Sequence, residues 1–273
     1  MRLSSAGTRL VAVLRPVVIA AGWLAVWQIS TAAADHSFFP TPLRIADTAR
    51  QLWLSGPASR LWLTDHVTHD IAPSLLRMLG GWTAAAILGV TAGLWLGRCP
   101  RALDYARVPI NLARAAPPPL LVPVFLVTLG LTPAMEVVTI ITGVVWPVLL
   151  TTIDGARAIS PELTNTMRAF RLSRARWIIW IVIPAAAPRI FAGLRTSLAI
   201  ALILMVVSEL AGSTSGIGYQ LALARSTFAL GEMWAWICLL GALGYTLNQL
   251  LLRLQRRLLT WQHHDAPPRV QRR

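Results

Sequence analysis

Residues 161–190 read PELTNTMRAFRLSRARWIIWIVIPAAAPRI and place five arginines between strongly apolar stretches. The whole chain is 55% hydrophobic and only 13% charged. Runs of about 20 apolar residues, which are long enough to cross roughly 30 Å of hydrocarbon, flank this segment and recur along the chain. They lie near residues 10–29, 73–97, 108–130, 133–153, 188–211 and 233–254. The sequence therefore predicts an all-α, polytopic membrane protein with about six transmembrane helices.

The distribution of arginine predicts which way these helices run. All 25 basic residues are arginine, and the net charge is +14. Because cytoplasmic loops of membrane proteins are enriched in basic residues, the charge indicates orientation and not nucleic-acid binding. Arginines gather before the first apolar run and after the second, fourth and sixth. We expect residues 1–9, a loop over 154–187 and a tail over 255–273 to be cytoplasmic, and residues 10–254 to form the transmembrane domain.

The first apolar run has some features of a secretory signal. Arg2 and Arg9 precede it, and Ala32, Ala33 and Ala34 resemble a cleavage site. The run is long for a signal core and is interrupted by Arg15, so we expect a retained anchor. Whether or not the run is cleaved, the chain from residue 35 onward starts on the outer side of the membrane, and the later topology is unchanged.

Several chemistries are excluded or disfavoured by what the sequence contains. A phosphate-binding loop of the GxxxxGK[ST] type needs a lysine, and this chain has none, so we do not expect it to hydrolyse ATP by itself. The spacing of His66, His69 and Asp70, like the run His263–Asp265, permits a metal site on a helix, but polar residues at helix ends explain both equally simply. We predict no metal, no cofactor and, for Cys99 and Cys238, no disulfide.

Ionisable residues inside the spans are few. The candidates considered for a place near the membrane centre are Arg77, Arg114, Arg195 and Glu209, each of which can instead sit close to a membrane interface. Charges near the membrane centre usually mark an ion pathway, and no repeat of half the chain is evident. An ion-coupled secondary transporter is therefore the alternative hypothesis, and a membrane-embedded enzyme is more distant because no catalytic set is clustered in the spans.

Two of the predicted spans have distinctive small or proline residues. Residues 80–97, GGWTAAAILGVTAGLWLG, carry Gly89, Gly93 and Gly97 on one helix face, which allows close packing within the chain or in a dimer. Residues 108–130 contain five prolines, which must break or kink a helix. Broken backbone in a membrane lies against protein or a water-lined cavity, so the bend at Pro118, Pro119 and Pro123 marks either a translocation path or a structural kink.

Two short amphipathic helices are predicted outside the spans. Residues 41–53 begin with Thr41 before Pro42 and place Ile45, Ala49, Leu52 and Trp53 on one face, as in a helix on the outer membrane surface. In the opening stretch, Ser160 can cap a helix that begins at Pro161 and has Glu162 in its first turn. Leu163, Met167 and Phe170 form an apolar stripe, which suits anionic lipid or a groove in another protein.

The opening stretch resembles the cytoplasmic signature of ABC importer permeases, the binding-protein-dependent transport family, with the pattern E-A-A-x3-G-x9-I-x-L-P. Ile181 and Pro184 match that pattern, Ile183 stands for its leucine, and Thr166 and Met167 stand for its alanines. Residues 74–97, 184–202, 206–221 and the pair TW at 260–261 resemble, in order and spacing, the nitrate, sulfonate and taurine branch. The resemblance covers roughly residues 20–262.

This resemblance implies a type I importer fold in the plasma or inner membrane. Such permeases form dimers, offer the signature loop to separate cytoplasmic ATPases and receive a small solute from an extracytoplasmic binding protein. It implies an ATPase-coupling loop made by Glu162, Leu163, Asn165, Met167, Arg168, Phe170, Arg171, Ser173 and Pro184. We further expect a path or gate at Pro118, Pro119, Pro123, Glu209, Ser213, Gly216, Gly218 and Tyr219, although loop packing also explains the last five.

Two departures from the family pattern matter. Asn165 replaces an acid, and Arg171 replaces the glycine that permits a bend between two short helices. Arg171 favours a continuous helix, because a left-handed backbone at a residue with a side chain costs about 1 kcal/mol or more. One hypothesis is that this subunit couples asymmetrically, in a heterodimer with a second permease of more regular signature.

Overall fold

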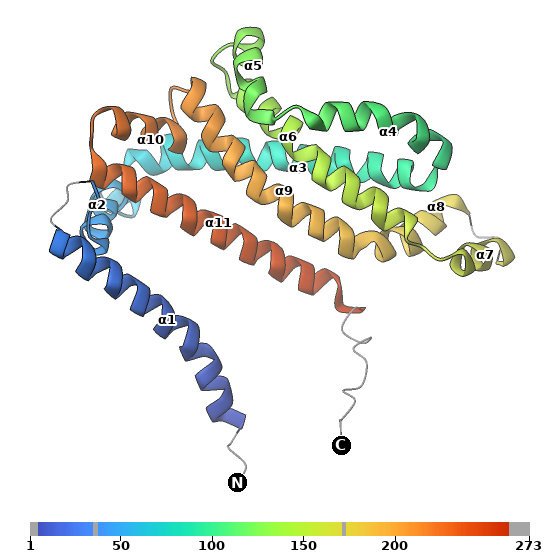
Figure 1. Ribbon diagram of the computed structural model, residues 1–273, viewed down its shortest axis with the longest axis horizontal. Helices are drawn as coiled ribbons and strands as arrows, with labels where there is room; N and C mark the ends of the chain where they lie inside the picture. The colour runs from blue at the N-terminus through green and yellow to red at the C-terminus, as the bar shows by residue number, and fades with distance from the viewer. Residues whose placement is uncertain (1–4, 35–37, 171–172, 262–273) are drawn as a thin grey trace. The chain divides into compact units, whose positions relative to one another are not determined.

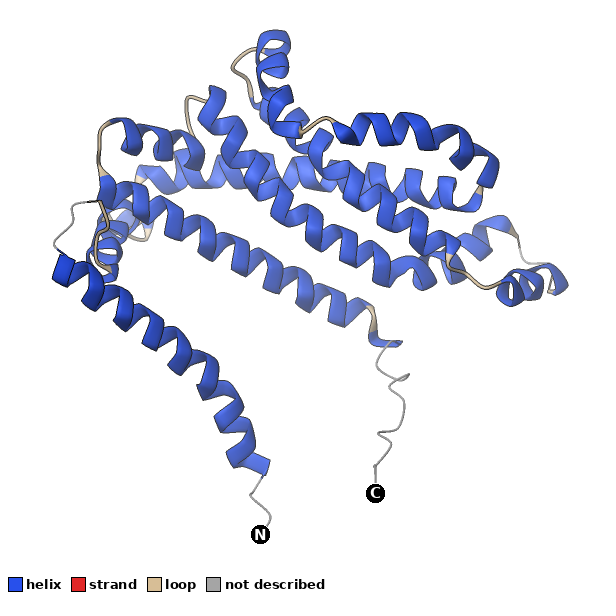
Figure 2. Cartoon of the chain, in the orientation of Figure 1, coloured by secondary structure: helices blue, strands red, loops and turns tan. Residues whose placement is uncertain are grey.

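The computed structural model describes residues 5–34, 38–170 and 173–261, and every regular element in these ranges is a helix (Figures 1 and 2). This confirms the all-α prediction. In chain order the helices are α1 Ser5–Ala34, α2 Pro42–Leu54, α3 Ala72–Arg98, α4 Pro100–Ala115, α5 Val122–Leu129, α6 Pro133–Arg157, α7 Pro161–Ala169, α8 Arg174–Trp177, α9 Ile183–Gly212, α10 Ile217–Ser226 and α11 Leu230–Leu258.

The chain divides into two compact units. The first comprises residues 1–70 and 220–239, and the second comprises residues 71–219 and 240–273. The second unit contains α3 to α9 and most of α11, so it holds the larger part of the predicted transmembrane domain. Each unit is described by itself below.

Within the described residues, four helical segments are long and apolar enough to cross a membrane: Val67–Arg98, Pro133–Arg157, Arg174–Gly212 and Leu230–Leu258. A fifth span is possible if Pro100–Ala115 and Pro118–Leu129, which meet at 77°, act as one. In α1, the apolar stretch Val17–Ala33 is shorter than these four segments. The structure thus supports four or five of the six expected spans by length and composition.

The second unit is built on close packing of α3 against α6. Buried Gly81, Gly89 and Gly97 of α3 face Ile140, Val148 and Ala156 of α6, in the same order along both helices. An alanine Cβ at Gly89 would lie 2.9 Å from the Cβ of Val148, and one at Gly97 would lie 2.7 Å from the Cβ of Ala156. The small-residue face therefore packs within the chain, and the two helices run parallel.

The parallel arrangement of α3 and α6 explains the bent pair α4 and α5. Because α3 and α6 run in the same direction, the chain between them must return along their length. Only α4, α5 and the turn at Pro118–Leu121 lie between the two helices. We therefore count the bent pair as one returning span, and the break falls at the prolines that predicted it. At this break Pro118 packs against Gly143 of α6.

The remaining helices of the second unit run antiparallel to their neighbours. Gly155 near the end of α6 faces Ala186 near the start of α9, whereas Gly143 faces Leu204 farther along α9. Arg195 of α9 donates to Gln255 of α11 across a 3.0 Å hydrogen bond, while Gly244 lies near Leu202. The ends of α3, α6 and α11 and the start of α9 consequently lie at one end of the unit.

The first unit contains α1, α2 and the beginning of α11. Thr41 caps α2 by accepting a hydrogen bond from the backbone N–H of Arg44 at 3.3 Å, as predicted. Ile45 is buried, and Ala49, Leu52 and Trp53 are half-buried, so the predicted apolar face is the covered one. Trp53 packs edge-on against Trp236, with ring centroids 5.3 Å apart.

Candidate functional site

A buried charge network lies where α3, α6 and α9 meet, at the start of α3 and the end of α9. Arg77 Nη1 lies 2.6 Å from Glu136 Oε1, and Arg77 Nη2 lies 3.2 Å from Glu209 Oε1. The side chain of Arg77 is 11% exposed, that of Glu136 is 3% exposed and that of Glu209 is 0% exposed. A charge so far removed from water is tolerated only when it is paired, so these residues must be stabilised by one another.

The network also fixes the loop between α9 and α10. Ser74 donates to Glu209 Oε1 at 2.6 Å and accepts from the backbone N–H of Ile217 at 3.0 Å. The other oxygen of Glu209 accepts from the backbone N–H of Gly218 at 2.8 Å. Arg77 also donates to the carbonyl oxygen of Ser215 at 3.3 Å. Residues 213–218 are thus tied to α3 and α9 by side chains that are themselves buried.

Gly216 is required at its position in this loop for two reasons. Its φ is +123°, a backbone conformation that residues with a Cβ rarely adopt. A Cβ at this position would also lie 2.6 Å from the carboxyl carbon of Glu209. The loop therefore approaches the Glu209 carboxylate more closely than any residue with a side chain would permit.

Part of this network was expected from the sequence. The structure brings together Glu209, Ser213, Gly216 and Gly218, and half-buried Tyr219 follows them in α10. Glu209 is fully buried, so in this conformation it holds the loop and lines no open path. Pro119 and Pro123 are exposed at the α4–α5 break, away from the residues that bond to Glu209.

Sequence reasoning missed Ser74 and Glu136, and it did not pair Arg77 with any acid. The sequence did offer one signal: a base and two acids lie near those ends of three apolar runs that the predicted topology places on the same side of the membrane. Packing of α3 against α6 is needed to see that Arg77 and Glu136, 59 positions apart, meet. The second oxygen of Glu136 is buried and has no hydrogen-bond partner among the described residues.

The opposite end of the second unit carries the arginine segment, which we define as residues 158–182. α7 begins at Pro161, and Ser160 Oγ accepts from the backbone N–H of Leu163 at 3.4 Å, so the predicted cap is confirmed. Hydrogen bonds from the Ser160 side chain and from the backbone lower the pKa of the Glu162 carboxyl. Glu162 is therefore anionic at neutral pH, and its support of the α7 N-terminus is lost only as the pH falls through that lowered pKa.

The apolar stripe of α7 divides into two parts in the structure. Leu163 is 43% exposed and Phe170, directly after α7, is 75% exposed. Met167 instead packs against a cluster formed by Ala156, Ile159, Trp177 and Val182. Met167 is therefore partly covered by its own chain, and its role as a docking residue beside Leu163 and Phe170 stays a prediction.

The sequence left two alternatives at Arg171, a continuous helix or a strained left-handed backbone, and Arg171 itself lies outside the described residues. α7 ends at Ala169 and α8 begins at Arg174, with Ser173 accepting from the backbone N–H of Arg176 at 3.5 Å. Ser173 is a good N-cap residue, and a new cap favours a new helix over continuation. Asn165 is exposed on α7, Pro184 lies in the first turn of α9, and Arg171 and the side chain of Arg168 lie outside the described residues.

The two regions lie about 30 Å apart, because 21 residues of α3 separate Arg77 in the charge network from Arg98 at the arginine end, at about 1.5 Å per residue. This distance equals the thickness of a bilayer core, roughly 30 Å. The arginine segment and the charge network therefore lie at opposite faces of the membrane.

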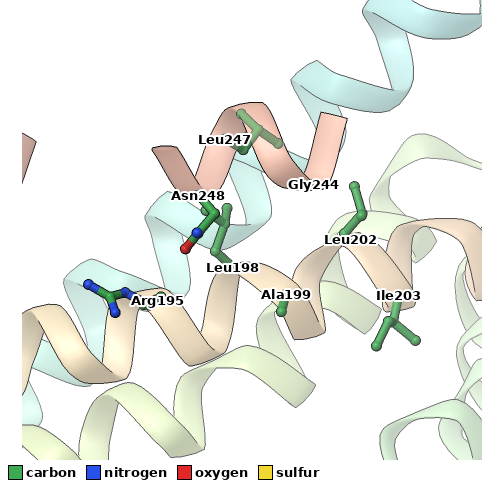
Figure 3. Close-up of a pocket in the computed structure, with 8 residues that line it drawn as sticks. All are labelled: Arg195, Leu198, Ala199, Leu202, Ile203, Gly244, Leu247 and Asn248. Atoms are coloured by element: carbon green, nitrogen blue, oxygen red, sulfur yellow. The ribbon is translucent and has the colours of Figure 1, made fainter. Parts of the chain in front are cut away.

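A hollow of about 380 Å³ lies between α9 and α11 (Figure 3). Its lining is apolar except for Arg195 and Asn248, which come from the two facing helices. Arg195 is exposed and donates a hydrogen bond to the neutral side chain of Gln255. A cation and an amide in an apolar lining are groups that suit a small oxyanion.

The histidines considered as metal ligands have other roles. In the first unit, Asp70 is buried and its carboxylate lies 2.8 Å from His66 Nδ1 and 2.9 Å from Gln220 Nε2. His66 also packs edge-on against Trp236, whereas His69 is exposed. The described residues contain no group of three suitable ligands for a metal ion. His263, His264 and Asp265 lie outside them.

Comparison with known proteins identifies this architecture. Residues 67–260 match the family described as the binding-protein-dependent transport system inner membrane component. The chain belongs to this family. It is therefore a multi-pass inner membrane protein, the permease subunit of an ABC importer, and a non-catalytic subunit.

Relatives and a solved structure agree with this assignment. The permease is 30% identical over 250 residues to SsuC of Bacillus subtilis, named as an aliphatic sulfonates transport permease, covering 92% of this chain and 87% of SsuC. It is 29% identical over 250 residues to the bicarbonate transport permease CmpB of Synechococcus elongatus, covering 90% of each. A chain of the inward-facing MetNI methionine ABC transporter shares the fold, with a TM-score of 0.54 at 18% identity over 68% of this chain and 95% of that one.

Permeases of this family act with an ATPase and a binding protein. That requirement agrees with the missing phosphate-binding lysine, which leaves ATP hydrolysis to another subunit. Family membership favours the importer over the ion-coupled carrier. The charges of Arg77, Glu136 and Glu209 are accordingly interpreted as mutual structural partners.

Proposed function

We propose that this permease forms the translocation path for a small anion and is coupled to a separate cytoplasmic ATPase through the arginine segment. The observation that carries the coupling is the pair of exposed apolar side chains, Leu163 and Phe170, on a short helix at the arginine-rich end. An exposed phenylalanine surrounded by charge fits a groove in a protein partner. Both termini are proposed to lie on this cytoplasmic side.

The proposed substrate class rests on relatives and on one feature of the spans. The sequence resemblance suggested sulfonate, taurine or nitrate, and the likeness to CmpB adds bicarbonate. These solutes are small oxyanions or carry an anionic group. Arg195 and Asn248 in the hollow between α9 and α11 supply donors that suit such a group.

The partners proposed are a second permease copy or paralogue, two ATPase subunits and an extracytoplasmic binding protein. Large exposed apolar side chains on α4 and α5, such as Tyr105, Leu112 and Val127, are 76–86% exposed in the single chain. A second permease in the membrane would cover such side chains. Whether it is a copy or a paralogue decides the heterodimer hypothesis raised by Asn165 and Arg171.

The test is purification of the tagged, detergent-solubilised permease from its native membrane, followed by identification of the chains that accompany it. We expect an ATPase to co-purify and to be lost when Leu163 and Phe170 are both changed to Asp. Leu43→Asp is the matched control, since Leu43 is 71% exposed on α2 in the other unit. Met167 is unsuitable for this test because it packs internally. A permease that purifies alone and transports solute without ATP would overturn the proposal.

A further inference from the structure

A cavity of about 740 Å³ lies beside the arginine segment, within the second unit. It is formed by the end of α3, the inward face of α7, and α8 with the π-helical turn Ile178–Val182 that follows. Small-molecule sites in proteins range over about 300–1,000 Å³, so this volume is that of a ligand site.

The lining of the cavity has two chemically different parts. Its apolar part is made by Leu94, Trp95, Trp177, Ile178 and Val182. Its basic part is made by Arg98 and Arg174. No acidic residue contributes to the lining. A ligand that fills both parts must join an anionic group to a hydrocarbon chain.

The position of the two arginines indicates which amphipathic anion is available. One candidate span ends at Arg98 and another begins at Arg174, so both residues lie at the boundary between hydrocarbon and cytoplasm. Trp95 is 64% exposed and Trp180 is 75% exposed at the same level, as is usual for tryptophans at a membrane interface. A basic pocket between spans on the cytoplasmic side is suited to an anionic lipid headgroup.

The guanidinium of Arg98 is held in place but retains donors. It donates to the carbonyl oxygen of Ala156 at 3.3 Å and lies 5.8 Å from the ring centroid of Trp177. One such bond uses only part of its five N–H groups. Arg174 is exposed and forms no ion pair with the described residues. Together they can contact one phosphodiester group.

We propose that this cavity binds an anionic phospholipid from the inner leaflet, with its phosphate at Arg98 and Arg174 and an acyl chain along Leu94, Trp95 and Ile178. Thr164 and Met167 of α7 form the wall opposite the spans. A bound lipid therefore supports α7 from the membrane side, and Leu163 and Phe170, which do not line the cavity, remain exposed. The lipid site itself does not depend on the proposed substrate or on the ATPase contact.

The test is native mass spectrometry of the purified full-length permease titrated with phosphatidylglycerol or phosphatidylcholine. We expect phosphatidylglycerol to bind at least fivefold more tightly, and Arg174→Gln to remove about fivefold of that affinity, since one basic residue near a membrane surface contributes about that much. Arg176→Gln is the matched control, because Arg176 is exposed on the same short helix but does not line the cavity. Equal losses in both variants would show nonspecific attraction and overturn the site.

A second variant tests whether the ligand occupies the space inside the cavity, and it leaves both arginines in place. Thr91 lines the cavity and bonds only to carbonyls of its own helix, so Thr91→Trp should fill the space and abolish binding. Leu88→Trp, on the same helix but outside the lining, should leave binding unchanged. Glycerol phosphate should not compete. If it competes as well as the lipid, the site takes a free anion and the proposal fails.

Hydrogen exchange gives a readout at α7 that is independent of transport. Phosphatidylglycerol should slow exchange of the backbone amides over residues 164–169 in the unmodified permease and not in Arg174→Gln. Lipid binding without any change in α7 would overturn the supporting role. A permease that binds lipid in this way but recruits no ATPase would leave this inference intact and refute the proposed function.

Discussion

At the scale of single residues, Arg77 determines whether the charge network is stable. Among the residues that the structure describes, it is the one base that forms ion pairs with two buried acids, Glu136 and Glu209. Its removal therefore leaves two buried carboxylates without a counter-charge. Breaking a buried pair in this way costs about 3–5 kcal/mol.

Arg77→Gln should lower the thermal unfolding midpoint of the detergent-purified permease strongly, and Glu136→Gln added to it should restore part of the loss. The physical reason is that the second change removes one of the two stranded charges. A double-mutant cycle over Arg77 and Glu136 measures this coupling. Effects that simply add would show that the two side chains act independently.

Gly216 gives a second test at this scale. Gly216→Ala should destabilise the permease, because alanine must adopt a φ of +123° and its Cβ would meet the Glu209 carboxylate. Gly80→Ala is the matched control, since nothing lies within 4 Å of a Cβ at Gly80. In a helix interior that change is favourable by about 0.5–1 kcal/mol. Similar thermal unfolding midpoints for the two variants would contradict the close approach of Gly216 to the Glu209 carboxylate.

At the scale of helices, the α3–α6 contact organises the second unit. Gly93 lies between Gly89 and Gly97 on this contact, and a Cβ there would come within 2.6 Å of Thr152 Cβ. The helices approach this closely because α3 presents glycine where α6 presents Val148 and Thr152. The same contact makes α3 and α6 parallel and so determines the course of α4 and α5.

Gly93→Ala should destabilise the permease by about 1–3 kcal/mol, as expected for overpacking of a close contact. Gly241→Ala in α11 should not destabilise the permease, because no atom lies within 4 Å of its added Cβ and alanine is favoured over glycine in a helix interior. Thermal unfolding of the two variants in the same detergent compares them directly. If Gly93→Ala were as stable as the control, α3 and α6 would not be packed as described.

The sequence predicted what is local and missed what depends on packing. Residue spacing identified the glycine face of α3, the proline break between α4 and α5, and the caps Thr41 and Ser160. It did not show that Met167 is partly covered by its own chain, because periodicity places a side chain on a face without saying whether α8 or a partner covers that face. It also did not anticipate the N-cap at Ser173, where α8 begins.

At the scale of the whole molecule, the direction of each span follows from two independent arguments. The distribution of arginine predicts that the ends of α3, α6 and α11 are cytoplasmic. Within the second unit, helix packing places these ends together with the start of α9, which is a separate observation from charge. The agreement requires α4 and α5 to cross the membrane together in spite of their 77° bend.

Labelling of single cysteines tests this topology in intact cells. Cys99 directly follows α3 and is partly exposed, whereas Cys238 lies within α11. With Cys238 changed to Ala, a membrane-impermeant maleimide should label Cys99 only after the cells are opened. With both cysteines removed, Ser55→Cys, after α2, should be labelled in intact cells. If Cys99 reacted from outside, α3 would run the other way, and a cytoplasmic ATPase could not then reach Leu163 and Phe170 at the same end of the unit.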